Sequence, residues 1–246
     1  MNRKLHILSL VVLLFATPYV YSQSVPGKIA NAIATRADEE WPNDADMRRN
    51  MIQEQTKAYR QMVGTTSAKN VPKKIFDGIR KRAVDKWHSD YAMQIHTIGD
   101  ETRAYREVVA LTSVNGVPQN VFDKIKSRSI EKWSREYGMQ LHTAKEESRA
   151  YRDVVDKTSH RGVGAEEFTR IKRMAIRKWE NDYGMQLHTI KEQCNDLVTI
   201  SEMKDVPNVS SSSLVQIKSS ASRKWPDDYG MQLHEIKERV NAIRDR

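Results

Sequence analysis

The chain has 246 residues, of which 30% are charged and 39% hydrophobic, and its formal net charge at pH 7 is +9. The hydrophobic share is too high for a disordered chain and slightly low for one compact core. The single cysteine, Cys194, excludes a disulfide within the chain and a cysteine-based zinc finger. The composition therefore indicates a folded, moderately basic protein that is not a disulfide-stapled scaffold.

Residues 1–22 have the features of a secretory signal peptide. Arg3 and Lys4 form a basic start, and the apolar run from Leu5 to Ala16 is too short to span a bilayer. We expect cleavage after Ser22, with an uncleaved anchor as the alternative. The sequence thus predicts an exported protein, either periplasmic or secreted.

A repeat of 46 residues organises the rest of the chain. Four of the five tryptophans stand in nearly identical text, such as KWENDYGMQLH and KWPDDYGMQLH, and each tryptophan follows the previous one after the same interval. Self-similarity at this period is typical of helical repeat proteins. We therefore divide a repeat domain, residues 23–246, into repeats 25–70, 71–116, 117–162, 163–208 and 209–246.

The first half of each repeat predicts a helix, here called helix A, that runs from the Val-Pro dipeptide or its equivalent to the tryptophan. Pro72 and Pro118 suit the start of a helix, where a missing N–H costs nothing. In repeat two the apolar residues are spaced three and four apart, at Ile75, Phe76, Ile79, Ala83 and Trp87. Basic residues before the tryptophan and acidic residues after it mark the end of one helix and the start of the next.

The second half predicts helix B, which in repeat two runs from about Ser89 to Thr112. Its apolar seam follows steps of four and three residues, at Tyr91, Ile95, Ile98, Thr102, Tyr105 and Val109. Repeat three has the same seam, ending at Val155, and Gly116 suits the C′ position after helix B. Each repeat is thus expected to form an antiparallel helical hairpin.

A second stripe on helix B, with Met93, Ala104 and Val108, lies away from this seam. An isolated hairpin would leave the stripe in water, whereas a stacked array would pack it on the next repeat. We therefore predict an all-α fold: an array of five 46-residue helical hairpins, an α-solenoid, after the signal peptide. The first repeat and the last are atypical, as the ends of such arrays are.

The recurring aromatic residues have two interpretations. A tryptophan and a tyrosine four residues apart, with an acidic residue between them, could stack on a sugar ring. They could equally fill the corner of the hairpin, as buried aromatic residues commonly do, and we favour this packing role. The pairs are Trp87 and Tyr91, Trp133 and Tyr137, Trp179 and Tyr183, and Trp225 and Tyr229.

A glutamine and a histidine also recur in helix B, and they form our candidate binding face. These residues are Gln94, His96, Gln140, His142, Gln186, His188, Gln232 and His234. The histidines of neighbouring repeats would stand on the order of 10 Å apart, too far to share one metal ion, so we expect no metal site. The glutamines could clamp an extended peptide or hold the loop after the tryptophan, and the sequence does not separate these roles.

The sequence contains no nucleophile elbow, phosphate loop, zinc-protease motif or pair of carboxylates typical of catalysis. Its distinctive residues recur in every unit, whereas an enzyme needs one unique constellation in a pocket. We expect a non-enzymatic scaffold without a cofactor that binds a protein or peptide. An acidic polysaccharide or other polyanion is also possible, but the mixed charges do not favour specific nucleic-acid binding. The alternative is a glycan-directed cell-envelope protein or enzyme that uses the Trp–acid–Tyr corner.

Overall fold

The computed structural model describes residues 24–244 of the chain. The predicted signal peptide therefore lies outside the described residues. Within the described part the chain forms ten α-helices and no extended sheet, which confirms the all-α prediction. The helices are α1 (Gly27–Glu40), α2 (Ala45–Gly64), α3 (Lys73–Trp87), α4 (Tyr91–Ala110), α5 (Gln119–Lys132), α6 (Tyr137–Asp156), α7 (Ala165–Trp179), α8 (Tyr183–Glu202), α9 (Ser211–Lys224) and α10 (Tyr229–Arg244).

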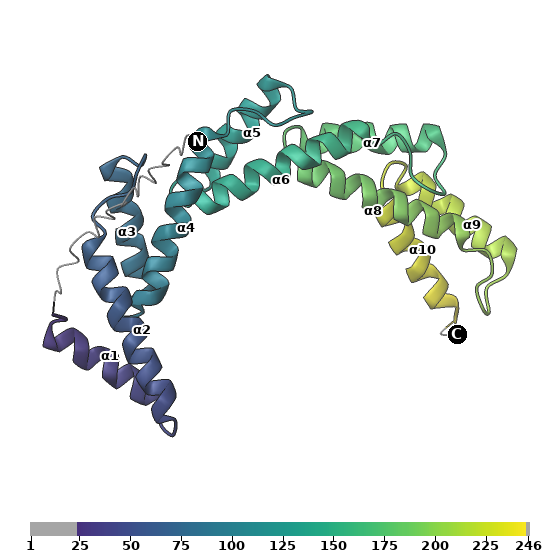
Figure 1. Ribbon diagram of the computed structural model, residues 1–246. Coiled ribbons are helices and arrows are strands. Elements are labelled where there is room, and N and C mark those ends of the chain that lie inside the picture. The colour runs from purple at the N-terminus through teal and green to yellow at the C-terminus, as the bar shows by residue number, and fades with distance from the viewer. Residues whose placement is uncertain (1–23, 245–246) are drawn as a thin grey trace, which may run out of the picture. The chain divides into compact units, whose positions relative to one another are not determined.

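These helices pair in chain order into five hairpins, so that odd-numbered helices are helix A and even-numbered helices are helix B (Figure 1). Within the hairpins α5 packs on α6, α7 on α8 and α9 on α10, and the first hairpin forms in the same way from α1 and α2. Neighbouring hairpins meet through their B helices, because α6 contacts α8 and α8 contacts α10. The predicted helical repeat array is thus confirmed.

The chain divides into two compact units. Among the described residues, one unit contains 24–66 together with 83–95, and the other contains 67–82 and 96–244. The first hairpin therefore belongs to one unit and the last three hairpins belong to the other.

The apolar stripe of helix A is buried where the sequence predicts it. Phe76, Ile79 and Ala83 are buried in α3, and every other helix A buries residues at the corresponding positions. These are Ile33 and Ala37 in α1, Phe122, Ile125 and Ser129 in α5, Phe168, Ile171 and Ala175 in α7, and Leu214, Ile217 and Ala221 in α9. Each large aliphatic or aromatic side chain buried in this way stabilises the fold by about 1.5–3 kcal/mol.

The seam of helix B is buried or partly buried except at its end. Val109 and Val155 are 58% and 51% exposed, so their predicted place in the hairpin core is wrong. Helix α5 has 14 residues and α6 has 20, and in an antiparallel pair the last turn of α6 extends beyond the start of α5. The neighbouring Val108 and Val154 are buried instead.

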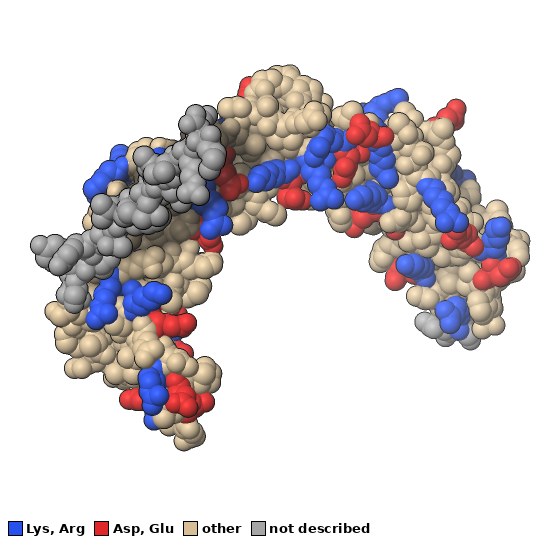
Figure 2. Space-filling model, viewed as in Figure 1, with Lys and Arg blue, Asp and Glu red and all other residues tan. Residues whose placement is uncertain are grey.

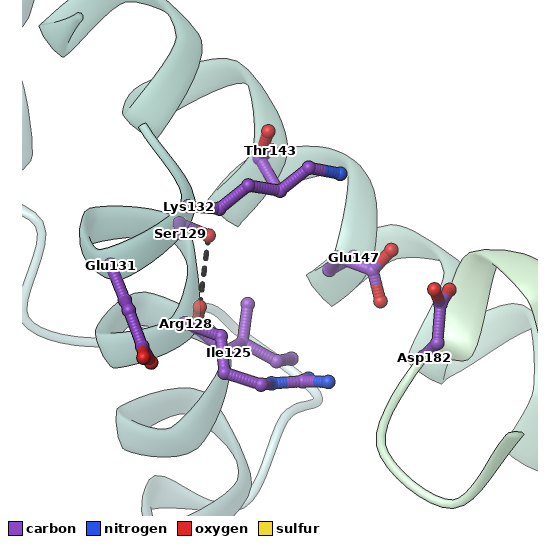
Figure 3. Close-up of a pocket in the computed structure, with 8 residues that line it drawn as sticks. All are labelled: Ile125, Arg128, Ser129, Glu131, Lys132, Thr143, Glu147 and Asp182. Atoms are coloured by element: carbon purple, nitrogen blue, oxygen red, sulfur yellow. Dashed lines mark hydrogen bonds between the residues drawn. The ribbon is translucent and has the colours of Figure 1, made fainter. Parts of the chain in front are cut away.

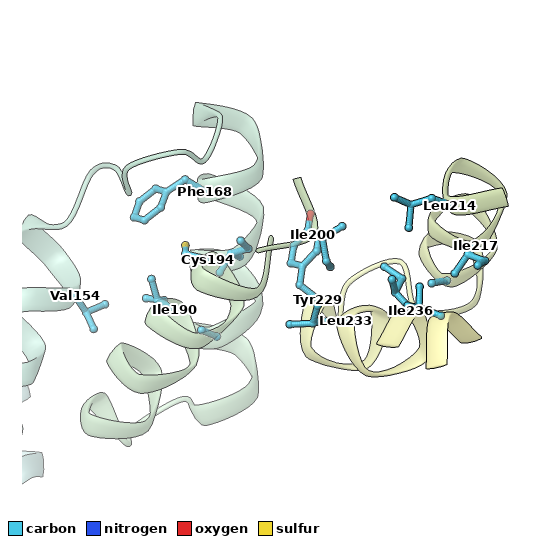
Figure 4. Packing of buried hydrophobic residues seen from close by; sticks show 14 residues of the cluster. Val154, Phe168, Ile190, Cys194, Ile200, Leu214, Ile217, Tyr229, Leu233 and Ile236 are labelled. Atoms are coloured by element: carbon cyan, nitrogen blue, oxygen red, sulfur yellow. The ribbon is translucent and has the colours of Figure 1, made fainter. Parts of the chain in front are cut away.

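Val154 shows what the second stripe of helix B packs against. It belongs to one cluster with Phe168 of α7, Ile190 and Cys194 of α8, and Leu233 of α10 (Figure 4). This cluster runs through three consecutive repeats, so the hairpins stack on one another and are not separate beads. Cys194 is fully buried among these side chains, in the slot that Thr102 and Ser148 occupy in repeats two and three.

The turn that joins one repeat to the next has a fixed backbone conformation. The residue three positions before the start of helix A has a positive φ, at Asn70, Gly116, Gly162 and Asn208, again at intervals set by the repeat. Glycine and asparagine tolerate this region best. Because α4 ends at Ala110, Gly116 belongs to this turn, and its expected C′ position after helix B is wrong.

Candidate functional site

In repeats two to five the start of helix B is capped by the helix B of the preceding repeat. Gln193 Oε1 in α8 accepts a hydrogen bond from the backbone N–H of Tyr229 at 2.7 Å, and Glu147 Oε2 in α6 accepts one from Tyr183 at 2.8 Å. The same contact joins Gln55 to Tyr91 and Glu101 to Tyr137. The first N–H groups of a helix have no partner within it, so these side chains satisfy them from outside.

The repeat's own acidic residue completes this cap. Asp182 Oδ1 accepts a hydrogen bond from the N–H of Met185 at 2.9 Å, and Asp228 Oδ1 accepts one from Met231 at 3.0 Å. The glycine after the tyrosine gives the neighbouring carboxylate room, because a Cβ at Gly184 would lie 3.0 Å from Glu147 Oε1. Two repeats together therefore satisfy the N-terminus of one helix.

The C-terminal end of helix B is held by a lysine from the following repeat. Lys172 of α7 donates to the carbonyl oxygens of Val155 and Lys157, and Lys126 of α5 donates to that of Leu111. Lys218 of α9 donates from Nζ to the carbonyl oxygen of Ile200, 2.5 Å away. A cation here interacts favourably with the unpaired carbonyls and with the helix dipole. Neighbouring repeats are thus joined at both ends of helix B.

Each central tryptophan is half-buried and its polar atom is engaged within its own repeat. Trp133 Nε1 donates to Thr143 Oγ1, and Trp179 Nε1 donates to Thr189 Oγ1, both at 2.8 Å. Lys132 lies over the ring of Trp133, with its Nζ atom 5.4 Å from the ring centre. Trp87, Trp179 and Trp225 also carry the lysine that precedes them over their rings.

The tyrosines that begin helix B pack against the preceding repeat. Tyr137 and Tyr183 meet Tyr105 and Tyr151 edge to face, with ring centres 5.0 and 5.1 Å apart. Arg128 lies over the ring of Tyr183, 5.8 Å from its centre. Tyr91 meets Tyr59 in the same way, and Tyr229 is buried. In the Trp–acid–Tyr corner the aromatic rings therefore contact protein groups, and the tryptophans stay partly exposed.

The recurring glutamines lie inside the protein. Gln94, Gln140, Gln186 and Gln232 are all buried, and each donates a hydrogen bond from Nε2 to a carbonyl oxygen in the loop after the tryptophan. The acceptors are His88, Trp133, Glu180 and Trp225. The amides thus hold the loop between helices A and B, and a partner on the surface does not reach them.

The recurring histidines, in contrast, lie on the surface of helix B. His96, His142, His188 and His234 are all exposed, and His188 Nε2 lies 3.1 Å from the carboxylate of Glu192. His96 Nδ1 lies 3.2 Å from Asp100 in the same arrangement. Of the two residue types in the predicted binding face, only the histidines are available to a partner.

Our sequence analysis missed two residues that share this surface. An acidic residue follows each histidine by four positions, and a methionine precedes it by three, a spacing that places all three residues on one face of a helix. We call this surface the Met–His–acid stripe. Its members are Met139, His142 and Glu146 in α6, Met185, His188 and Glu192 in α8, and Met231, His234 and Glu238 in α10. The sequence has the same spacing at Met93, His96 and Asp100, while repeat one has Met47, Asn50 and Glu54.

A cavity of about 380 Å³ lies where repeats three and four meet (Figure 3). Glu147 and Asp182 face one another across it, and Arg128 also lines it. Burial and the negative charge of Asp182 raise the pKa of Glu147, although two backbone N–H groups and Arg128 act against this. The cavity is thus part of the junction between repeats and is lined by two carboxylates.

A cavity of about 600 Å³ occupies the corresponding place between repeats one and two. Here Gln55 Nε2 donates to Asp90 Oδ1 at 3.0 Å, and Arg36 donates to Asp90 Oδ2 at 3.0 Å. Burial raises the pKa of Asp90, but the bonds from Gln55, the Met93 N–H and Arg36 together outweigh it and lower that pKa. In each cavity the pKa of one carboxyl is shifted, upward for Glu147 and downward for Asp90.

Among the described residues, no group of three or more His, Cys, Asp or Glu side chains is arranged to hold a metal ion. In the same part of the chain, no helix is both long enough and apolar enough to cross a bilayer. Comparisons with protein-family models, with curated proteins and with solved structures each found no match to this chain.

Proposed function

We propose that this chain is an exported, non-enzymatic helical-repeat scaffold that binds a protein or peptide partner along the Met–His–acid stripe. One observation carries the proposal: among the residues that recur once per repeat, the glutamines, tyrosines and tryptophans are engaged in packing, whereas the histidines are exposed. A repeated surface adds modest contacts into a stronger total affinity.

The chemistry of the stripe supports a protein partner over a polyanion. Each copy combines a thioether, an imidazole and a carboxylate, and a lysine precedes the acidic residue at Lys145, Lys191 and Lys237. On the face drawn in Figure 2, basic and acidic side chains are interspersed and no continuous basic track is visible. Such a mixed surface offers hydrogen bonds to a polypeptide, while each carboxylate would repel a polyanion.

No observation favours the glycan-directed alternative as a second proposal. Stacking on a sugar requires a free aromatic face, and the recurring tryptophans and tyrosines carry lysine, arginine or tyrosine side chains against their rings. The same corner that could bind a glycan is used to close the hairpin and to join the repeats.

The proposal is tested by retention of partners from extracts of the source organism on the immobilised chain. The stripe variants are His142→Ala, His188→Ala and His234→Ala, made singly and together. The matched control replaces three exposed polar residues of helix A, one in each of the same repeats, by alanine: Asn120, Thr169 and Gln216. Circular dichroism checks that every variant is folded.

We expect a retained protein to be lost stepwise as histidines are removed and to be unaffected by the control. All-or-none loss at the first substitution would contradict a repeated surface. Equal loss in the control variant would place the binding face elsewhere. A retained polyanion that is released by high salt would show that charge, not the stripe, determines binding.

A further inference from the structure

The Met–His–acid stripe also has the composition of a metal site. In α6, α8 and α10 a methionine lies one helical turn before a histidine, at Met139 and His142, Met185 and His188, and Met231 and His234. Residues three apart on a helix have Cβ atoms about 5–6 Å apart, so flexible side chains can bring their ends to one ion. The histidines are exposed, and the methionines are partly or largely so.

In α8 the acidic residue of the stripe contacts the imidazole. Glu192 Oε2 lies 3.1 Å from Nε2 of His188, which leaves Nδ1 as the other nitrogen of the ring. A histidine that binds a metal through one nitrogen commonly donates its other N–H to a carboxylate, which fixes the tautomer and makes the ligand more basic. His188 therefore lies between a carboxylate one turn ahead and a thioether one turn behind.

The ligand types determine which ion fits. A thioether is a soft ligand that favours soft ions such as Cu(I), and imidazole also suits copper. We propose that α6, α8 and α10 each bind one soft monovalent metal ion, Cu(I) or Ag(I), through the methionine sulfur and one histidine nitrogen of the stripe. Such ions are stable with few ligands, so two side chains of one helix suffice. This site stands independently of the protein partner proposed above.

Repeat one provides an internal comparison. It retains Met47, which is 37% exposed, and Glu54, but Asn50 replaces the histidine. An asparagine amide is a weak ligand for a soft ion. Repeat one is therefore expected to bind no such ion until a histidine is restored at position 50.

The test is a titration of the purified chain with Ag⁺, followed by native mass spectrometry and isothermal calorimetry. Cys194 is itself a soft ligand, so all variants carry Cys194→Ser, which the same slot tolerates as Ser148 in repeat three. Met139→Leu, Met185→Leu and Met231→Leu should each lower the bound metal by about one ion, because leucine keeps the side-chain volume but removes the sulfur. Met174→Leu, in α7, is the matched control and should change nothing.

A gain of binding gives the sharper result. Asn50→His should add about one bound Ag⁺, and the methyl NMR signal of Met47 should shift when the ion binds. The proposal is overturned if the three leucine substitutions leave the amount of bound Ag⁺ unchanged, or if Asn50→His adds none. Because the purified chain is titrated alone, failure here leaves the partner-binding proposal to its own experiment.

Discussion

Two junctions between repeats cap the start of helix B in different ways. One lies between repeats one and two, and the other lies between repeats three and four. In the first, the Gln55 amide accepts a hydrogen bond from the Tyr91 N–H and donates one to Asp90. In the second, the Glu147 carboxylate also accepts from the N–H of the next helix, but it can only accept, and it faces Asp182. The amide therefore both accepts and donates, whereas the carboxylate only accepts, from the N–H groups of Tyr183 and Gly184, and adds a like charge.

The difference recurs at the remaining junctions and follows the residue type. Gln193 reproduces the amide arrangement, because it accepts from the Tyr229 N–H and donates to Asp228 at 3.3 Å. Glu101, which accepts from the Tyr137 N–H at 2.8 Å, reproduces the carboxylate arrangement. A cap shared between repeats therefore tolerates either glutamine or glutamate. The two residues differ in how much they stabilise the fold and in how that stability depends on pH.

The largest effect is expected when an amide junction is removed. Gln193→Ala should lower the free energy of unfolding by about 1–2 kcal/mol, because it leaves the Tyr229 N–H without its cap and removes one of the two donors to Asp228. Glu147→Ala should cost less, since it also removes a charge that repels Asp182. Denaturation followed by circular dichroism measures both variants. A greater loss in Glu147→Ala would contradict the comparison.

Conversion of one junction type into the other should have an intermediate effect. Glu147→Gln should raise the free energy of unfolding at pH 7 by about 0.5–1 kcal/mol, because the amide keeps the cap and donates to Asp182. The reverse change, Gln193→Glu, should lower it by a similar amount. If Glu147→Gln proves destabilising under the same denaturation conditions, the carboxylate contributes more than a cap.

The smallest expected effect is the dependence of the free energy of unfolding on pH. The pKa of Glu147 is raised above its ordinary value of 4.5, so its contribution to stability is full below that value and is lost as the pH rises through the raised pKa. The pKa of Asp90 is lowered from 3.8, so its contribution is present above 3.8 and is lost only as the pH falls through the lowered pKa. Acidification from neutral pH toward about 5 should therefore stabilise the Glu147 junction and leave the Asp90 junction unchanged.

This pH dependence is checked with thermal denaturation curves of the native chain and of Glu147→Gln at several pH values. The native chain should gain stability relative to Glu147→Gln as the pH falls toward 5. If the stability of the two proteins changes with pH in parallel, the pKa of the Glu147 carboxyl is the same in the folded and unfolded states.

The sequence was sufficient for the features that depend on periodicity. The interval between tryptophans predicted the hairpins, and the spacing of residues such as Phe76 and Ile79 predicted which face of helix A is buried. Burial at the end of helix B was mispredicted, because Val109 and Val108 are both apolar and only the unequal helix lengths decide between them. The position of the positive-φ turn at Gly116 also depends on where the preceding helix ends.

The candidate site was predicted less completely, because periodicity on one helix does not reveal contacts between helices. The Glu147 cap on Tyr183 joins residues 36 positions apart and depends on how the repeats stack. The burial of Gln140 and the exposure of His142 were not separated either, since both are polar and two positions apart. The spacing of Met139, His142 and Glu146, in contrast, was visible in the sequence.

The central claim is that each repeat caps the helix B of the next, which leaves the Met–His–acid stripe free for partners. Amide hydrogen exchange at the first residue of helix B tests it most directly. The amides of Tyr183 and Tyr229 should exchange far more slowly than that of Ala45, which begins α2 in the first repeat, and Glu147→Ala should remove the protection at Tyr183 alone. Exchange at Tyr183 and Tyr229 as fast as at Ala45 would contradict the account.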